Sequence, residues 1–358
     1  MPSPSPLASS SVPSGGGSPP DPGIIARAGK EGSVKESSDD RVRAGEVRFI
    51  PLSVGETIRP EEGSGRTAGS FFADLIDDRG IELNDKDILV LSSKVVGILE
   101  GARVRLDDVR PSRKARILGR VFHKDPRKVQ LIMESGRVLI VVPMKWIIRI
   151  PSVRRMMERR SANPAAMRAG FERTNSYEFV VSAHAAYLDD AGIDYSNLPG
   201  GFVSLLPSDP CATAGKIRAE IMERFGKDVA VIITDTVVSV GRVGSQDVAI
   251  GYAGIDPVTR VTFSDDLFGV PRSGGVDILV DSIAGMAGLV MGQTTERSPA
   301  VVVRGVDYLP EPEDEEGMAA LAYPPGAQWR MAVYTIVATV WFHLVDLITF
   351  QRWPRRSV

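Results

Sequence analysis

The pattern of apolar positions divides the chain into buried strands and amphipathic helices. The run from Val229 to Asp235 begins as a nearly continuous series of β-branched residues, which predicts a strand buried on both faces that ends at Asp235 and Thr236. Similar runs over residues 87–92 and 300–305 predict two further buried strands. Residues 46–52 predict a short strand at which the folded part of the chain begins.

Helical spacing of apolar residues marks the segments between these strands. Phe71, Phe72, Leu75 and Ile76 fit one face of a helix. Asp209 opens a longer helix that Gly226 closes and whose buried stripe is formed by Ile217, Ile221, Met222 and Phe225. The pattern further predicts short basic helices over 111–120 and 125–133, an apolar strand over 138–150, a basic loop or helix over 151–169, and a strand followed by a small-residue helix over 276–289.

The two ends of the chain differ from its centre. Residues 1–45 are rich in Ser, Pro and Gly and then charged, which predicts a disordered tail without a secretory signal. Residues 46–305 form the predicted catalytic domain, and residues 306–358 add an acidic loop and an apolar helix. The stretch 331–350 is long enough to span a bilayer, but His343 and Asp346 are costly in lipid and favour a buried or dimer-interface helix over membrane contact.

Composition excludes several classes of function. The net charge is −2 and no dense Lys/Arg block occurs, which argues against nucleic acid as a partner. Cys211 is the single cysteine, so a disulfide framework and a cysteine zinc site are excluded. The three histidines make a histidine metal site improbable. A reducing compartment, the cytoplasm, is expected.

Polar residues after the buried strands are candidates for binding chemistry. Asp235 could ligate Mg²⁺ or Mn²⁺, which prefer hard oxygen ligands, or could simply cap the next turn. The acidic segment 189–197 and Asp209 offer a hard-cation site or ordinary Asx turns. Ser92-Ser93-Lys94 could hold a phosphate or form a polar turn. The Walker-type phosphate loop and a clean dinucleotide fingerprint are both missing from the sequence.

An ordered series of motifs then points to a family. The chain resembles coenzyme F420-0:L-glutamate ligases between about Val47 and Gly305, in motifs at residues 90–96, 100–101, 124–127, 189–197, 205–210, 232–236, 249–254, 289–292 and 300–305. The resemblance implies an α+β fold of mixed sheets with packed helices, the γ-glutamyl-ligase-like fold, assembled as an intertwined homodimer. It implies a ligase that uses GTP and Mg²⁺ or Mn²⁺ to join L-glutamate to the carboxylate of a deazaflavin, F420-0, through an acyl phosphate.

Site residues follow from the same resemblance. Asp194 and Asp235 match ligands of a first metal, and Thr236 and Gln293 match ligands of a second. GTP contacts are expected from Ser93, Asn197, Met291, Gly292, Gln293, Thr294, Thr295, Glu296, Arg297 and Ser298. The resemblance assigns no residue to deprotonating the incoming amine.

The chain departs from the family pattern near the expected phosphates. Ile98 replaces a lysine, and the segment Val237–Gly241 lacks one glycine and one arginine, leaving Arg242. Asp190 replaces an asparagine and adds negative charge beside the metal site, and residues 151–177 look inserted. Lys94 or Arg242 could replace the lost cation. The alternative function is a paralogue that binds a nucleotide or deazaflavin without ligation.

Overall fold

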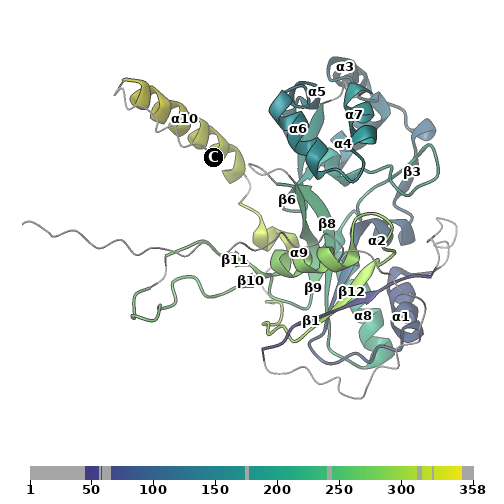
Figure 1. Ribbon diagram of the computed structural model, residues 1–358. Helices are drawn as coiled ribbons and strands as arrows, with labels where there is room; N and C mark the ends of the chain where they lie inside the picture. The colour runs from purple at the N-terminus through teal and green to yellow at the C-terminus, as the bar shows by residue number, and fades with distance from the viewer. Residues whose placement is uncertain are drawn as a thin grey trace, which may run out of the picture. The chain divides into compact units, whose positions relative to one another are not determined.

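A mixed β-sheet carries helices on both of its faces (Figure 1). The computed structural model describes residues 45–55, 58, 66–173, 177–239, 244–271, 273–312, 317–324 and 326–348. The predicted tail, apart from Gly45, lies outside the described residues. So do Val240, Gly241 and Arg242 of the segment that follows Asp235, and part of the predicted acidic loop, residues 313–316.

The central sheet contains the strands predicted at residues 46–52, 87–92, 229–235 and 300–305, together with one strand that was not predicted. Its order is β1 (Arg48–Leu52), β12 (Ala300–Arg304), β2 (Ile88–Ser92), β8 (Ala230–Val238) and β9 (Ser245–Ala253). The pair β2–β8 is parallel and the other neighbouring pairs are antiparallel. With helices packed on this mixed sheet, the predicted α+β fold is confirmed.

Alternation along the strands divides the core between the two faces of the sheet. Leu89 and Leu91 of β2 join the apolar cluster of α1 (Ala68–Asp78) and α8 (Pro210–Phe225). Ile88 and Val90 join the cluster of α9 (Leu279–Met291) on the other face. Successive side chains of a strand point to opposite faces, so a strand covered on both sides must be apolar at every position.

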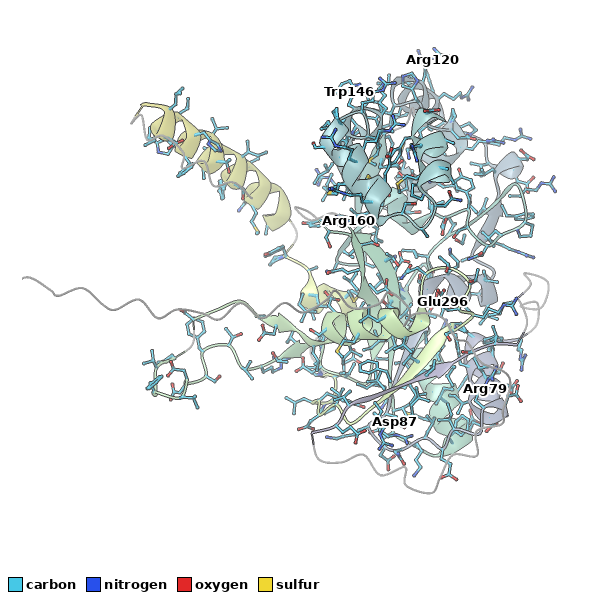
Figure 2. The ribbon with its side chains drawn as sticks, in the orientation of Figure 1. Arg79, Asp87, Arg120, Trp146, Arg160 and Glu296 are labelled. Carbon is cyan, nitrogen blue, oxygen red and sulfur yellow. The ribbon has the colours of Figure 1, made fainter. Side chains whose placement is uncertain are left out.

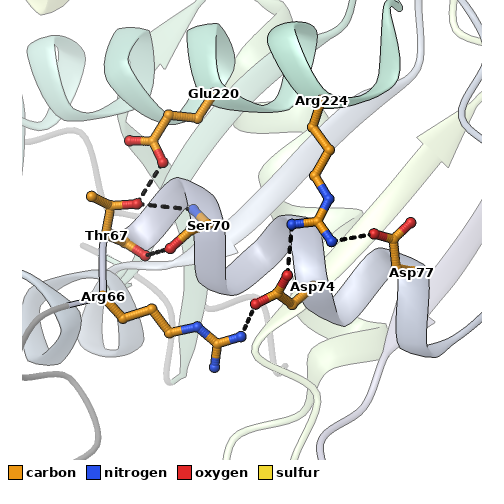
Figure 3. A network of polar contacts seen from close by, with 7 residues as sticks. All are labelled: Arg66, Thr67, Ser70, Asp74, Asp77, Glu220 and Arg224. Carbon is orange, nitrogen blue, oxygen red and sulfur yellow. Dashed lines mark hydrogen bonds and ion pairs between the residues drawn. The ribbon is translucent and has the colours of Figure 1, made fainter.

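Polar contacts align α1 with α8 at the surface (Figure 3). The Thr67 hydroxyl caps α1 by accepting a hydrogen bond from the Ser70 N–H. Arg224 of α8 pairs with Asp74 at 2.7 Å and with Asp77 at 2.5 Å on α1. Exposed ion pairs contribute only about 0–1 kcal/mol each, so the buried stripe of α8 supplies most of the free energy that holds the two helices together.

A smaller antiparallel sheet supplies part of the site. Its order is β4 (Arg137–Val142), β5 (Glu178–Ala183) and β6 (Ala186–Asp189), and it packs with α3 (Arg113–Val121) and α4 (Pro126–Ser135) around a separate apolar cluster. The remaining elements are α2 (Ser93–Leu99), β3 (Arg103–Arg105), η2 (Leu106–Asp108), α5 (Met144–Ile147), α6 (Pro151–Arg160), α7 (Pro164–Arg173), η3 (Asp190–Gly192), β7 (Phe202–Ser204), β10 (Val258–Thr259), β11 (Asp277–Ile278), η4 (Gly317–Leu321) and α10 (Ala327–Ile348).

Two strand boundaries differ from the predictions. β8 does not end at Asp235 but continues to Val238, because β9 pairs with it as far as Val238 opposite Ser245. The apolar stretch 138–150 is a strand only as far as Val142. Pro143 has no N–H to donate to a strand ladder, and α5 follows it. Residues 151–169, left open between loop and helix, fall in α6 and α7.

The C-terminal helix α10 is not buried against the described part of its own chain. Tyr334 is 67% exposed, Trp341 67% and Leu347 74%. Burial within its own chain, one of the two predicted alternatives, is therefore not found among the described residues, and a helix at a dimer interface stays a prediction. Among the described residues, no helix combines the length and the apolar character that crossing a membrane requires.

Candidate functional site

One cavity of about 1080 Å³ collects the residues that the sequence selected. It lies where β2 passes into α2 and extends along the loop after β6, along β8 and β9, and along the loop after α9. Every metal or nucleotide residue that the family resemblance assigned lines it: Ser93, Asp194, Asn197, Asp235, Thr236, Met291, Gly292, Gln293, Thr294, Thr295, Glu296, Arg297 and Ser298. The predicted site is thus brought together from four separate stretches of chain.

Two consecutive residues at the start of α2 hold the two aspartates of the predicted first metal. The Ser93 hydroxyl donates to Asp235 Oδ1 at 2.9 Å. The Lys94 ammonium donates to Asp194 Oδ2 at 2.5 Å and also contacts Ser196. Ser93, expected to touch GTP, is therefore engaged with a carboxylate, and Lys94 places a positive charge beside the cavity that Ile98 also lines.

The two aspartates differ in their electrostatic surroundings. Burial raises the pKa of Asp235 to about 6, against the hydrogen bond from Ser93 that favours the carboxylate. Burial opposes ionisation of Asp194 as well, but hydrogen bonds from Lys94 and Ser196 outweigh it and lower its pKa to about 2. Asp235 is thus a carboxylate that lacks sufficient compensating positive charge, which a bound cation would provide.

The residues of the predicted second metal lie side by side. Thr236 Oγ1 and Gln293 Oε1 are 3.1 Å apart. Ligand atoms about 2.1 Å from an octahedral Mg²⁺ and adjacent around it lie about 3 Å from each other. A hydroxyl oxygen, an amide oxygen and the neighbouring carboxylates are also the hard donors that such a cation takes. These residues fit Mg²⁺ or Mn²⁺.

Asp247 belongs to this group and was missed in the sequence. Its carboxylate is buried, and Oδ1 accepts hydrogen bonds from the Thr236 hydroxyl at 2.7 Å and from Gln293 Nε2 at 3.0 Å. The Gln293 amide that donates its N–H₂ group to Asp247 keeps its oxygen available as a ligand. A β8–β9 hairpin register, which places Asp247 opposite Thr236, is the signal that would have found it.

Asp247 should orient both ligands, so its removal should weaken cation binding. We expect Asp247→Ala to lower Mn²⁺ affinity by about 10–100-fold, as changes to groups that hold a ligand in place usually do. Asp247→Asn, which keeps one oxygen acceptor, should lose less. Isothermal titration with Mn²⁺ measures both variants. Equal affinity for wild type and Asp247→Ala would show that Asp247 has no such role.

The loop after α9 forms one wall of the cavity. α9 ends at Gly292, whose φ is +71°, and a Cβ there would lie 2.3 Å from Glu296 Cδ. The Glu296 carboxylate accepts from the Thr294 N–H at 2.7 Å and from its hydroxyl at 3.0 Å. Hydrogen bonds at Arg297 and Ser298 join the loop to residues 53–55, of which Val54 lines the cavity and was also missed.

The cavity lies at one end of β2, and a buried ion pair lies at the other end. Glu296 lies on the cavity wall, whereas Asp87 precedes β2 at its other end (Figure 2). There Asp87 accepts from Arg304 at 2.9 and 2.8 Å, with 2% and 5% of these residues exposed. Asp209, a candidate cation ligand, instead caps α8 by accepting from the Ala212 N–H at 3.0 Å.

Asp190, which stands in place of an asparagine, adds a balanced charge beside the metal residues. Lys124 lies 2.5 Å and Lys128 2.7 Å from its Oδ2. The Phe179 N–H donates to Oδ1 at 3.1 Å. Asp190 therefore adds the negative charge that was predicted, and two lysines on or beside α4, distant in sequence, compensate it.

Fold and site together define a class: an α+β protein with a carboxylate- and hydroxyl-lined cavity suited to hard cations. The family model described as F420-0:Gamma-glutamyl ligase matches residues 63–305. The coenzyme F420:L-glutamate ligase of Methanopyrus kandleri is 33% identical over 271 residues, covering 76% of this chain and 91% of the relative. The enzyme of the same name from Methanothermobacter thermautotrophicus is 30% identical over 257 residues, covering 71% and 89%. The chain belongs to the F420-0:γ-glutamyl ligase family, and the resemblance seen in its motifs is confirmed.

Proposed function

We propose that the protein forms an amide between L-glutamate and the terminal carboxylate of the deazaflavin F420-0, driven by GTP and Mg²⁺ or Mn²⁺. The names of its relatives support glutamate ligation in F420 biosynthesis. The observation that carries the metal and GTP part is the cavity that joins Asp194, Asp235, Thr236 and Gln293. The homodimer and the cytoplasmic location suggested by the sequence belong to the same proposal.

The reaction requires two bond exchanges in one cavity. The γ-phosphoryl group of GTP passes to the acceptor carboxylate and GDP leaves. The glutamate ammonium group loses one proton to become an amine, whose nitrogen replaces phosphate at the activated carbonyl carbon and loses a second proton as the amide forms. Asp194, Asp235, Thr236 and Gln293 would hold the cations, which would supply positive charge to neutralise the phosphates during the first exchange. Lys94 supplies a positive charge at the same place, and the loop of residues 291–298 encloses the cavity beside it.

The test is a ligation read by mass spectrometry. The full chain is incubated with F420-0, GTP, Mn²⁺ and L-glutamate, and the acceptor is expected to gain one or more glutamyl residues only when GTP and Mn²⁺ are both present. Omission of each component is the control. An acceptor of unchanged mass in the complete mixture would contradict the ligase.

A second candidate is a paralogue that binds a nucleotide or deazaflavin without ligation. The apolar side chain of Ile98 in the cavity wall favours it, because a lysine there would neutralise phosphate. Calorimetric binding of GTP with Mn²⁺, combined with an unchanged acceptor mass, would select this candidate.

A further inference from the structure

The same cavity has a second group of charged residues that the metal site does not use. Lys128, Glu178, Asp189 and Asp190 line it together with Asp194 and Asp235. Carboxylate oxygens of Glu178, Asp189 and Asp190 lie within 4.8 Å of one another. These residues come from α4, from the start of β5 and from the end of β6, so the small sheet brings this group to the cavity.

Most charges in this group are paired. Asp190 forms ion pairs with Lys124 and Lys128 and accepts a hydrogen bond from the Phe179 N–H. Lys124 also pairs with Glu178 at 2.9 Å and is 7% exposed. Lys128 lies over the Tyr195 ring, with its Nζ 5.0 Å from the ring centroid. The lysine charges are therefore directed mainly at Asp190 and Glu178.

Asp189 is the exception. Its Oδ1 is buried and, within the described part of the chain, accepts no hydrogen bond. Burial, together with the charges of Glu178 and Asp190, raises the pKa of Asp189 to about 6. A buried carboxylate oxygen without a donor is costly, so a group that brings N–H donors and positive charge would be stabilised there.

We propose that Asp189 and Glu178 bind the α-ammonium group of the amino-acid substrate, with Lys128 beside one of its carboxylates. This subsite rests on the proposed ligase, whose second substrate is an amino acid with one ammonium group and two carboxylates. An ammonium group offers three N–H donors to the clustered oxygens, and a lysine ammonium can donate to Asp190 and to a ligand at once. A divalent cation is less suited, because Lys124 and Lys128 already place two positive charges against the same carboxylates.

A pair of ligands isolates the ammonium group. Isothermal titration compares L-glutamate with glutarate, which keeps both carboxylates and lacks the amine, on the full chain with GTP and Mn²⁺ present. Wild type should bind L-glutamate more tightly than glutarate. In Asp189→Asn we expect L-glutamate affinity to fall at least about 10-fold, a loss typical of an unpaired charged contact, with glutarate affinity unchanged.

Stability and a control variant complete the experiment. Asp189→Asn removes a buried charge, so its melting temperature should equal or exceed that of wild type. Asp307→Asn makes the same change at a side chain that is 97% exposed, and should bind both ligands as wild type does. Glu178→Gln tests the same subsite if the first variant folds poorly.

Three results would overturn the subsite: equal L-glutamate affinity in wild type, Asp189→Asn and Glu178→Gln; no preference of wild type for L-glutamate over glutarate; or loss of Mn²⁺ affinity in Asp189→Asn with L-glutamate affinity retained. A different result would refute the proposed ligase. Selective L-glutamate binding by a protein that transfers no phosphoryl group from GTP would leave the subsite standing and refute the ligase.

Discussion

Asp235→Asn is expected to abolish metal-dependent GTP turnover with F420-0 present and to weaken Mn²⁺ binding by more than about 100-fold. Replacing a group that only orients a metal ligand costs about 10–100-fold, and Asp235 is proposed to be a ligand itself. Its carboxylate is partly buried and is positioned by the Ser93 hydroxyl, so water can replace it only poorly. Calorimetry with Mn²⁺ and a phosphate-release assay measure the two effects, with Asp307→Asn as the exposed control.

The pH dependence of Mn²⁺ affinity should also differ between wild type and Asp235→Asn. A cation binds the ionised carboxylate, and the metal-free pKa of Asp235 is about 6, so protons compete as the pH falls through that value. Wild-type Mn²⁺ affinity should be nearly constant above pH 7 and fall towards about tenfold per pH unit below pH 6. The part of this dependence due to Asp235 should be absent in Asp235→Asn. Undiminished turnover in the variant would refute the site.

Arg304→Met is expected to destabilise the fold by about 3–5 kcal/mol, the usual cost of leaving one partner of a buried ion pair without the other. Arg304 donates to both oxygens of Asp87 and, at 2.6 Å, to the Glu82 carbonyl. Urea unfolding measures the free energy. The double variant Asp87→Leu/Arg304→Met should recover part of the loss, because it removes the uncompensated charge.

Binding should be unaffected by this change. Arg304 lies at the end of β12 that pairs with Arg48 and with the start of β2, whereas the cavity is at the other end of β2. Mn²⁺ affinity of folded Arg304→Met should therefore match wild type. A destabilisation below about 1 kcal/mol would show that Asp87 finds sufficient compensation from other groups.

Local patterns in the sequence were sufficient to predict every strand of the central sheet except β9. A β-branched run such as Val229–Ile233 favours a strand that is covered on both faces. The site residues were found through motifs, each of which is short and continuous. Pairings between distant segments were not visible. Asp247 was missed because it comes close to Thr236 only through the pairing of β8 with β9, which no local pattern predicted.

Charge balance was the other feature that the sequence could not provide. Asp190 was predicted to add negative charge, but its compensation by Lys124, 66 positions away, was not. Arg304, in the motif at 300–305, pairs with Asp87, which is 217 positions away in the sequence. Exposure of α10 was equally hidden, since an apolar segment does not reveal whether its own chain covers it.

Because Lys94 contacts Asp194, a metal cation that bound this carboxylate would have to replace the lysine ammonium group. Lys94 already neutralises Asp194 from 2.5 Å, so a divalent ion that bound there would displace the lysine charge instead of meeting an unpaired carboxylate. The displaced ammonium group would stay near the N-terminus of α2, because Lys94 follows Ser93, which holds Asp235. A phosphate that bound together with the cation could then accept hydrogen bonds from the released Lys94 ammonium. Binding of the cation and binding of the phosphate would thus be coupled through this one side chain.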